Sequence, residues 1–341
     1  MKNTRITALA LALCMVFGIA LAACGTTTIK DSGVAMTAGI DGMDTLDENA
    51  VDNSESEEME LDLAMLAEAA PIPNTLQPVA SGTNVLKNSA AAIDVSNTSD
   101  GYSMIRYLGN GTSRLKVLIT GPSGITYNYN LTTSGEYEVF PFSDGNGSYK
   151  IGVYQNVSGT SYSTLYSTTV NVKLTDEFAP FLLPNQYVNY TPDTLVVQEA
   201  AKLCAGETEL SAKLGKMYDW VVKNYKYDYK LASTVKSGYL PVLDTIYEKK
   251  SGICFDYAST LTAMLRSQDI PTKLVVGYAG KAYHAWINVY SEKEGWINAA
   301  IYFDGNVWKR LDPTFASTAG NSSSILKYIG DGANYSESYI Y

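Results

Sequence analysis

Cysteine and histidine are scarce in this sequence. Its 341 residues include four cysteines and one histidine, His284. One histidine, with cysteines far apart along the chain, provides none of the usual ligand spacings of a metal site, so we predict neither a metal nor another cofactor. A disulfide between Cys204 and Cys254 remains open, because an exported chain meets oxidising conditions.

Basic residues are missing from a long stretch near the N-terminus. Between Asp31 and Glu68 there are twelve acidic residues and no basic one, in a chain of net charge −10. The remainder holds 25 basic and 23 acidic residues and has no basic stripe, which argues against nucleic-acid binding. We predict that residues 24–76, which include Pro71 and Pro73, form a disordered acidic linker that acts as a tether.

The chain starts as an exported protein does. Lys2 and Arg5 precede an apolar run over residues 6–23, and the run ends in Leu-Ala-Ala followed by Cys24. This arrangement resembles the lipobox of bacterial lipoproteins and predicts a signal peptide over residues 1–23. The resemblance implies lipidation of Cys24 and a location on the extracellular face of the bacterial cell membrane, anchored by lipid. The alternative is an uncleaved membrane anchor.

Short alternating runs of apolar and polar residues follow the linker. They are separated by Ser-Gly, Asn-Gly and Asp-Gly pairs and recur about every ten residues, which predicts an all-β, Ig-like sandwich over residues 77–175. The expected strands cover residues 102–107, 115–120, 127–131, 137–140, 149–154 and 165–172. A calcium loop at residues 144–147 is disfavoured against a hairpin turn, because later acidic ligands are missing. The sandwich is a spacer or a binding module.

The pattern becomes helical from about residue 195, after a connection that contains three prolines. Apolar residues at helical spacing over residues 197–204 and 210–221 are explained by core packing, with Cys204 as a buried small side chain. Together with later strand-like runs, these helices predict an α+β domain over residues 195–341.

A third helical stretch begins at Cys254. Gly252 permits a tight turn before it, and apolar residues then recur at helical spacing until Pro271. In the first turn of a helix, unpaired backbone N–H groups and the helix dipole favour a thiolate over a thiol. The same N–H groups can hold the oxyanion of a tetrahedral intermediate. Asp256 and Tyr257 follow the thiol, where capping and packing explain them.

A base and an orienting residue can be assigned from two later runs. His284 belongs to an alternating, strand-like run over residues 283–290, and Asp312 ends a second strand-like run that Pro313 stops. A cysteine, a histidine and an aspartate from three separate elements form the set that thiol acyl transfer requires.

Three motifs together carry a family resemblance. The stretch GICFDYASTLTAMLRSQDIPTKLVVGYA, followed by YHAWINVY and LDPTF, resembles the transglutaminase-like superfamily of papain-like thiol enzymes, over about residues 210–316. The resemblance implies that Cys254 is the nucleophile, His284 the general base and acid, and Asp312 the residue that orients the imidazole. It also implies a helix that starts at the cysteine and packs against an antiparallel sheet.

Some parts of the sequence leave alternatives open. An added stretch, GWINAAIYFDGNVW, predicts an extra strand and brings in Asp304 as a rival of Asp312, although an aspartate in a turn has a structural explanation. The side chain that completes the oxyanion hole is not identified among four upstream tyrosines, at positions 225, 227, 229 and 239. The tyrosine-containing tail over residues 319–341 is a candidate cover for the active site.

The predicted function is that of a membrane-tethered extracellular thiol enzyme, with hydrolysis of peptide or amide bonds as the first choice. Its substrate would be a protein or peptide at the cell surface, and cell-wall material is a further candidate. Two alternatives use the same fold: a cross-linking transglutaminase, and a surface-binding lipoprotein without catalysis. The 26 tyrosines suit the second alternative as a contact surface.

Overall fold

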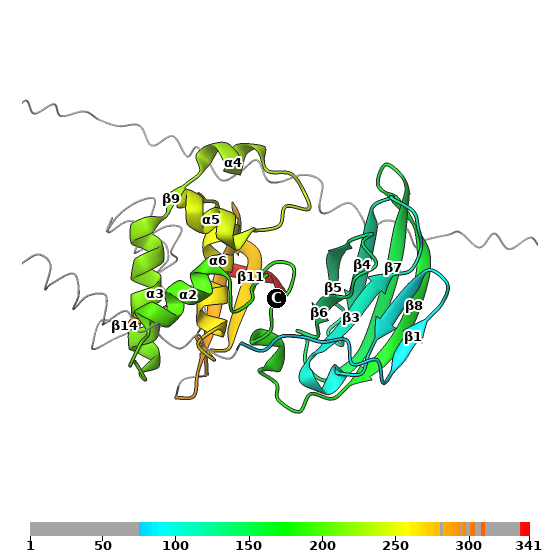
Figure 1. Ribbon diagram of the computed structural model, residues 1–341. Helices are drawn as coiled ribbons and strands as arrows, with labels where there is room; N and C mark the ends of the chain where they lie inside the picture. The colour runs from blue at the N-terminus through cyan, green and yellow to red at the C-terminus, as the bar shows by residue number, and fades with distance from the viewer. Residues whose placement is uncertain (1–74, 280–281, 294, 298–300, 304–307, 311–334) are drawn as a thin grey trace, which may run out of the picture.

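The computed structural model describes residues 75–279, 282–293, 295–297, 301–303, 308–310 and 335–341 (Figure 1). The predicted signal peptide, Cys24 and nearly all of the acidic linker lie outside these residues, as do Asp304 and Asp312. Within the described ranges, no helix combines the length and the apolar character needed to cross a membrane.

Two four-stranded antiparallel sheets form the N-terminal part of the described chain (Figure 1). The first has the order β1-β2-β3-β6, with β1 at Val85–Lys87, β2 at Ala91–Asp94, β3 at Tyr102–Tyr107 and β6 at Glu138–Pro141. The second has the order β5-β4-β7-β8, with β4 at Leu115–Thr120, β5 at Thr126–Leu131, β7 at Gly147–Ser158 and β8 at Ser161–Val172. Of two short 3-10 helices, η1 at Thr98–Asp100 lies between β2 and β3, and η2 at Ala179–Phe181 follows β8.

The alternating sequence explains how the two sheets pack. In β4, Leu115, Val117 and Ile119 are buried, and the residues between them are partly exposed. These side chains share one core with Ile93 and Ile105 of the other sheet. Strands β3 and β4 have the predicted bounds, and β7 and β8 extend beyond theirs because they pair along most of their length.

The second part of the chain combines helices with another antiparallel sheet. Its helices are α2 at Leu195–Leu203, α3 at Leu210–Asn224, α4 at Tyr229–Thr234, α5 at Leu243–Lys249 and α6 at Cys254–Arg266. Its main sheet has the order β13-β12-β11-β16, with β11 at Thr272–Ala279, β12 at Ala282–Ser291, β13 at Gly295–Ile297 and β16 at Tyr335–Ile340. Two two-stranded ladders join β9 at Lys226–Tyr227 to β10 at Ser251–Gly252, and β14 at Ile301–Phe303 to β15 at Trp308–Arg310.

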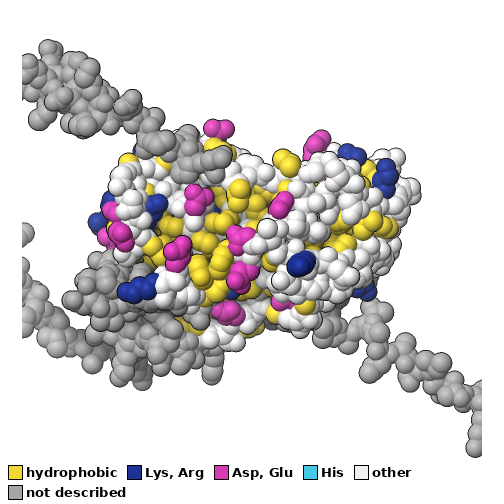
Figure 2. Space-filling model, turned by 90° about the horizontal axis from the view of Figure 1, so that it is seen from below, with side chains coloured by type: hydrophobic (Ala, Val, Ile, Leu, Met, Phe, Trp, Pro, Cys, Tyr) yellow, Lys and Arg dark blue, Asp and Glu magenta, His cyan; other side chains and the backbone are white. Residues whose placement is uncertain are grey.

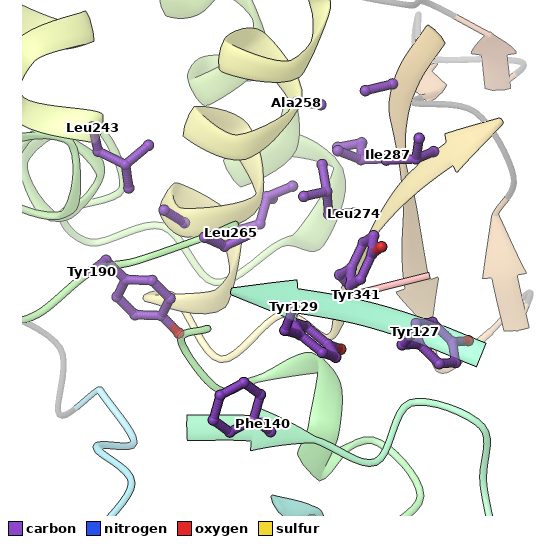
Figure 3. Packing of buried hydrophobic residues seen from close by; sticks show 14 of the residues in the cluster. Tyr127, Tyr129, Phe140, Tyr190, Leu243, Ala258, Leu265, Leu274, Ile287 and Tyr341 are labelled. Carbon is purple, nitrogen blue, oxygen red and sulfur yellow. The ribbon is translucent and has the colours of Figure 1, made fainter. Parts of the chain in front are cut away.

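Helix α6 is the centre of this part. Ala258, Leu261 and Leu265 are at most 1% exposed, and they share a core with Leu274 of β11 and Ile287 of β12. Figure 3 shows Leu274 and Ile287 beside α6. The helix is therefore fixed along its length by burial of its apolar face.

An aromatic cluster joins the two parts of the chain. Tyr341, which follows β16, lies between Tyr187 (ring centroids 4.4 Å apart) and Tyr127 and Tyr129 of β5 (both 5.7 Å). Figure 3 shows the three labelled rings, those of Tyr127, Tyr129 and Tyr341, close together. The apolar core is consequently continuous from the β-sandwich to α6.

Candidate functional site

The turn before Cys254 is held by backbone pairing. Strand β10 pairs in parallel with β9, and the Asp228 N–H donates to the Gly252 carbonyl oxygen at 2.9 Å. Just upstream, Lys250 has φ = 50° and its Nζ lies 3.3 Å from the ring centroid of Tyr247 and 4.4 Å from that of Trp220. This cation–π contact anchors the chain where α5 ends and the turn begins.

The absence of a side chain at Gly252 lets the Asp256 side chain pack close to the backbone. A Cβ atom placed on Gly252 would lie 2.5 Å from the Asp256 Cβ and 2.7 Å from its Oδ2. That oxygen accepts a hydrogen bond from the Ile253 N–H at 2.8 Å. The tight turn expected at Gly252 thus has a specific reason, because the missing side chain makes room for a carboxylate that caps the helix.

Cys254 is the first residue of α6 and is partly exposed. Cys204 lies at the end of α2, where it is 5% exposed, and burial raises the pKa of its thiol. Both cysteines are free thiols, so the disulfide that the sequence left open is not formed. The exposed thiol at the helix start is the reactive candidate, and the buried thiol packs in the core.

His284 lies on β12, as predicted, and is 3% exposed. It pairs with Gly277 of β11, and its ring centroid is 6.2 Å from that of Trp286 and 6.4 Å from that of Tyr335 on β16. Gly277 lacks the Cβ that would contact the Ser336 carbonyl oxygen and the Trp286 ring. The glycine therefore permits the close packing beside the imidazole.

Tyr283 on β12 is electrostatically coupled to Cys254. Burial raises the pKa of the Tyr283 phenol, and Tyr339, Tyr278 and Cys254 add to this rise. Side chains alternate along a strand, so His284 points to the face that also carries Trp286, and Ala285 packs toward α6. His284 therefore alternates with Tyr283 and Ala285, which belong to the core cluster that includes Cys254, and the pairing of thiol with imidazole stays a prediction.

The third predicted member of the site, Asp312, falls outside the described residues, and so does its rival Asp304. The extra strand expected before Asp312 is present, because β14 and β15 pair with each other. Of the tail, residues 335–340 form β16, which pairs with β11 at the edge of the main sheet. The proposal that the tail covers the site stays untested.

Among the carboxyl groups described around Cys254, Asp256 has the most perturbed pKa. It is fully buried, its Oδ1 accepts a hydrogen bond from the Tyr239 hydroxyl at 2.8 Å, and its Oδ2 accepts from the Ile253 N–H. Burial raises the pKa of Asp256 to about 6, and the charge of Asp228 adds to this, whereas the two hydrogen bonds oppose it. A carboxyl group that titrates near neutral pH therefore lies on the same turn as Cys254.

Sequence reasoning found the helix and missed the contact between Asp256 and Tyr239. An acidic residue at the third position of a helix is a capping signal, which suits Asp256. Nothing in the sequence singles out Tyr239 from the three other upstream tyrosines, because its partner lies 17 residues away on another element. The structure shows the Tyr239 hydroxyl bonded to Asp256, whereas Tyr225 is 2% exposed and Tyr229 is 64% exposed.

The chemistry that these groups can support is nucleophilic. In the described part of the chain, no three histidine, cysteine or carboxylate side chains come together as a metal site would require. A partly exposed thiol at the start of a buried helix suits attack on a carbonyl carbon, and N–H groups at the start of a helix can stabilise the resulting oxyanion.

Several known proteins and one family profile are similar to this region of the chain. A sequence profile of the transglutaminase-like superfamily matches residues 198–313, which include α6 and β12. The uncharacterized protein YebA of Bacillus subtilis is 24% identical over 166 residues, or 40% of this chain and 22% of that protein. A protein-glutamine gamma-glutamyltransferase of Pseudomonas aeruginosa is 28% identical over 69 residues, or 16% of this chain and 10% of that protein. The chain thus spans less than a quarter of the length of either relative.

Two solved structures resemble the chain weakly. One is a candidate cysteine protease from Cytophaga hutchinsonii, with a TM-score of 0.31, 21% identity, and coverage of 70% of this chain and 76% of that one. The other is the periplasmic domain of TgpA from Pseudomonas aeruginosa bound to ethylmercury, with a TM-score of 0.26, 14% identity, and coverage of 68% and 98%.

Proposed function

Residues 198–313 carry a transglutaminase-like domain, and we propose that the protein is a surface thiol enzyme that hydrolyses peptide or amide bonds through Cys254, His284 and Asp312. The observation that carries the proposal is the position of Cys254, partly exposed at the first residue of a helix whose other turns are buried. Family members use a cysteine in this place as the nucleophile, so the helix start and the family match support the same role.

The proposed reaction passes through a thioester. The Cys254 thiolate attacks the substrate carbonyl carbon, a C–S bond forms, and first-turn N–H groups of α6 hold the oxyanion. His284 takes the thiol proton and returns it to the leaving amine as the C–N bond breaks. Water then attacks the thioester carbonyl carbon and gives its proton to His284. The C–S bond breaks, and His284 returns the proton to the departing Cys254 thiolate, so the products are a carboxylic acid and the free thiol. Asp312 is assigned to orient the imidazole.

Hydrolysis is preferred over cross-linking because water reaches any exposed site, whereas a lysine acceptor needs its own channel. Cross-linking is the second candidate, and the short match to the Pseudomonas aeruginosa gamma-glutamyltransferase favours it. A third candidate is a binding protein without catalysis, which the exposed tyrosine ring of Tyr229 and the apolar surface seen in Figure 2 would suit.

The proposed location follows from the sequence outside the described residues. Cleavage before Cys24 and lipidation of its thiol would anchor the chain on the outer face of the membrane, and the acidic linker would hold the folded part away from the bilayer. The proposed substrates are proteins or peptides of the cell surface, with cell-wall material as a further candidate. On the face shown in Figure 2, Lys and Arg side chains are few and scattered, which suits a function without nucleic acid.

The test separates the candidates in one assay. The full-length protein is incubated with a peptide library, with and without a fluorescent primary amine, and products are identified by mass spectrometry. Hydrolysis predicts new carboxyl termini or deamidated side chains that disappear in Cys254→Ser and in His284→Ala. Covalent incorporation of the amine would favour cross-linking instead, and an unchanged library that nevertheless binds the protein would favour the binding function.

A further inference from the structure

Asp256 is buried behind the turn Gly252–Cys254 and is not one of the three residues of the proposed triad. Its carboxyl group receives hydrogen bonds from two sides, at 2.8 Å from the Ile253 N–H and at 2.8 Å from the Tyr239 hydroxyl. Ile253 immediately precedes Cys254, so one of these bonds fixes the backbone that presents the thiol. The other fixes the carboxyl group itself.

The turn is built around this carboxyl group. Gly252 has no room for a Cβ because Asp256 fills that space, and the Gly252 carbonyl oxygen is held by the Asp228 N–H. Displacement of the carboxyl group would open the space behind Gly252 and release the Ile253 N–H. Both changes would alter the first turn of α6, whose N–H groups face the reaction in the proposed mechanism.

Tyr239 comes from a separate segment of the chain, the loop over residues 235–242 between α4 and α5. This loop extends from the helices toward the β-sandwich (Figure 1), and a Cβ on Gly238 would lie 3.9 Å from the Asn130 Nδ2 of β5. The hydrogen bond to Asp256 therefore ties a loop between the two parts of the chain to the start of α6. Tyr239 is partly exposed, whereas the Asp256 carboxyl group that accepts its hydrogen bond is buried.

We propose that Asp256 and Tyr239 form a positioning pair that holds the turn Gly252–Cys254 in its reactive geometry and couples the reactivity of Cys254 to the protonation of one buried carboxyl group. The proposal rests on the proposed function, because it assumes that Cys254 is the nucleophile. Neither residue contacts substrate in this account, and both act through the backbone on either side of the thiol.

Three ionisable groups from other elements are electrostatically coupled to the Asp256 carboxyl group. Tyr239 comes from the loop, Asp228 caps α4, and Tyr225 follows α3; each is electrostatically coupled to Asp256. The Tyr239 hydroxyl bond favours the ionised carboxylate of Asp256. Burial, and then the charges of Asp256 and Asp228, raise the pKa of Tyr239, so the phenol remains the donor. Ionisation of Asp256 near pH 6 would therefore strengthen both of its hydrogen bonds.

The test measures the alkylation rate of Cys254 by iodoacetamide between pH 5 and 8, in full-length protein, with peptide mapping by mass spectrometry. The variants are Asp256→Asn, which keeps an acceptor for the Ile253 N–H, Asp256→Ala, which removes it, and Tyr239→Phe. Tyr229→Phe is the matched control, because this ring is 64% exposed and lies on the neighbouring helix.

If the positioning pair acts as proposed, the alkylation rate of Cys254 in the wild type shows a step near pH 6. That step is absent in Asp256→Asn and moves to higher pH in Tyr239→Phe, because the lost hydroxyl no longer favours the carboxylate. The rate at pH 7 falls about fivefold in Tyr239→Phe, the factor that corresponds to one ordinary hydrogen bond, and falls further in Asp256→Ala than in Asp256→Asn. Tyr229→Phe keeps the wild-type profile.

Two different failures can be distinguished. A wild-type thiol that reacts readily, with a rate and a step that Asp256→Asn and Tyr239→Phe leave unchanged, would overturn the positioning pair and leave the proposed function intact. A wild-type Cys254 that reacts no faster than Cys204 in unfolded protein, at every pH, would contradict the proposed function, and with it the pair. Because Tyr239→Phe removes a single oxygen atom from a partly exposed residue, it keeps the test usable if Asp256→Ala does not fold.

Discussion

Gly252 lies two residues before Cys254, and the carboxyl group of Asp256 occupies the space that a side chain would need there. The two residues therefore depend on each other. The glycine makes room for the Asp256 carboxyl group, and this group holds the turn by accepting a hydrogen bond from the Ile253 N–H. The sequence made a turn at Gly252 predictable. It could not show that the reason is the packing of a side chain four positions later.

Substitution of Gly252 by alanine tests this dependence. The new Cβ would lie 2.5 Å from Asp256, which is too close for either residue to keep its place. We expect a loss of about 1–3 kcal/mol in the free energy of unfolding, as for overpacked cores, together with slower alkylation of Cys254. Chemical denaturation measures the first effect. Gly111→Ala is the control, because its nearest atoms, the side-chain ends of Gln155 and Tyr107, lie at 3.1 Å; equal losses in both variants would contradict the account.

The buried carboxyl group also predicts a pH-dependent stability. The pKa of Asp256 is raised from 3.8 to about 6 in the folded protein, so the folded state binds its proton more tightly than the unfolded state does. The stabilisation is complete below pH 3.8 and is lost as the pH rises through about 6. At roughly 1.4 kcal/mol for each pKa unit, the difference in unfolding free energy between wild type and Asp256→Asn should change by about 2 kcal/mol between pH 4 and pH 7. Denaturation curves at both pH values measure it, and a difference independent of pH would refute the assignment.

At the scale of elements, Arg266 joins the end of α6 to three other segments. Its side chain is 2% exposed and donates hydrogen bonds to the carbonyl oxygens of Leu183, Thr272 and Tyr341. Burial lowers the pKa of the guanidinium group to about 10, so it stays charged at neutral pH. The planar group suits carbonyl oxygens that approach from several directions.

Replacement of Arg266 by methionine should therefore be costly. It would leave three carbonyl oxygens without this donor in the interior, and each buried unsatisfied group costs about 1–3 kcal/mol. We expect a loss of more than about 3 kcal/mol in unfolding free energy. Arg114→Met is a matched control, since exposed Arg114 donates to the carbonyl of Gly159 alone among the described contacts and should change stability by less than about 0.5 kcal/mol. A loss in Arg266→Met as small as in the control would show that the carbonyl groups find other partners.

The elements also show what periodicity can predict. Strands β3 and β4 were expected at their observed bounds, and in β4 the apolar side chains alternate residue by residue. The stripe of Cys254, Ala258, Leu261 and Leu265 likewise predicted α6. Strand β16 was not expected in the main sheet, because a strand at the end of the chain gains its place from long-range pairing with β11. The contact of Tyr239 with Asp256 was missed for the same reason.

At the scale of the whole molecule, aromatic side chains join the sandwich to the helical part. Tyr341 contacts rings from β5 and Tyr187, and Phe255, the neighbour of Cys254, lies 5.7 Å from Tyr187. A second contact lies at η2, where Lys273 Nζ is 3.9 Å from the Trp296 ring and 5.0 Å from that of Phe181. We therefore expect the two parts to unfold as one cooperative unit.

Tyr341→Ala tests this coupling. The ring is 4% exposed, so its loss should cost about 3–5 kcal/mol, as for other buried aromatic residues. The backbone hydrogen bonds of residue 341 with Leu274 are retained, so the change isolates the ring. Calorimetry should show one transition in the wild type and a lower midpoint in the variant, or two separate transitions. Tyr229→Ala is the control, and an equal midpoint in both variants would mean that the cluster does not couple the parts.

The central claim is that Cys254 forms a covalent acyl intermediate. The most direct measurement mixes the full-length protein with an activated acyl ester, quenches the reaction within its first turnover, and locates the acyl group by peptide mapping. The account predicts a thioester on Cys254 and none on Cys204, and slower acylation in His284→Ala that is shown to be folded. A protein that carries no acyl group on Cys254, or one that acylates equally fast without His284, would contradict it.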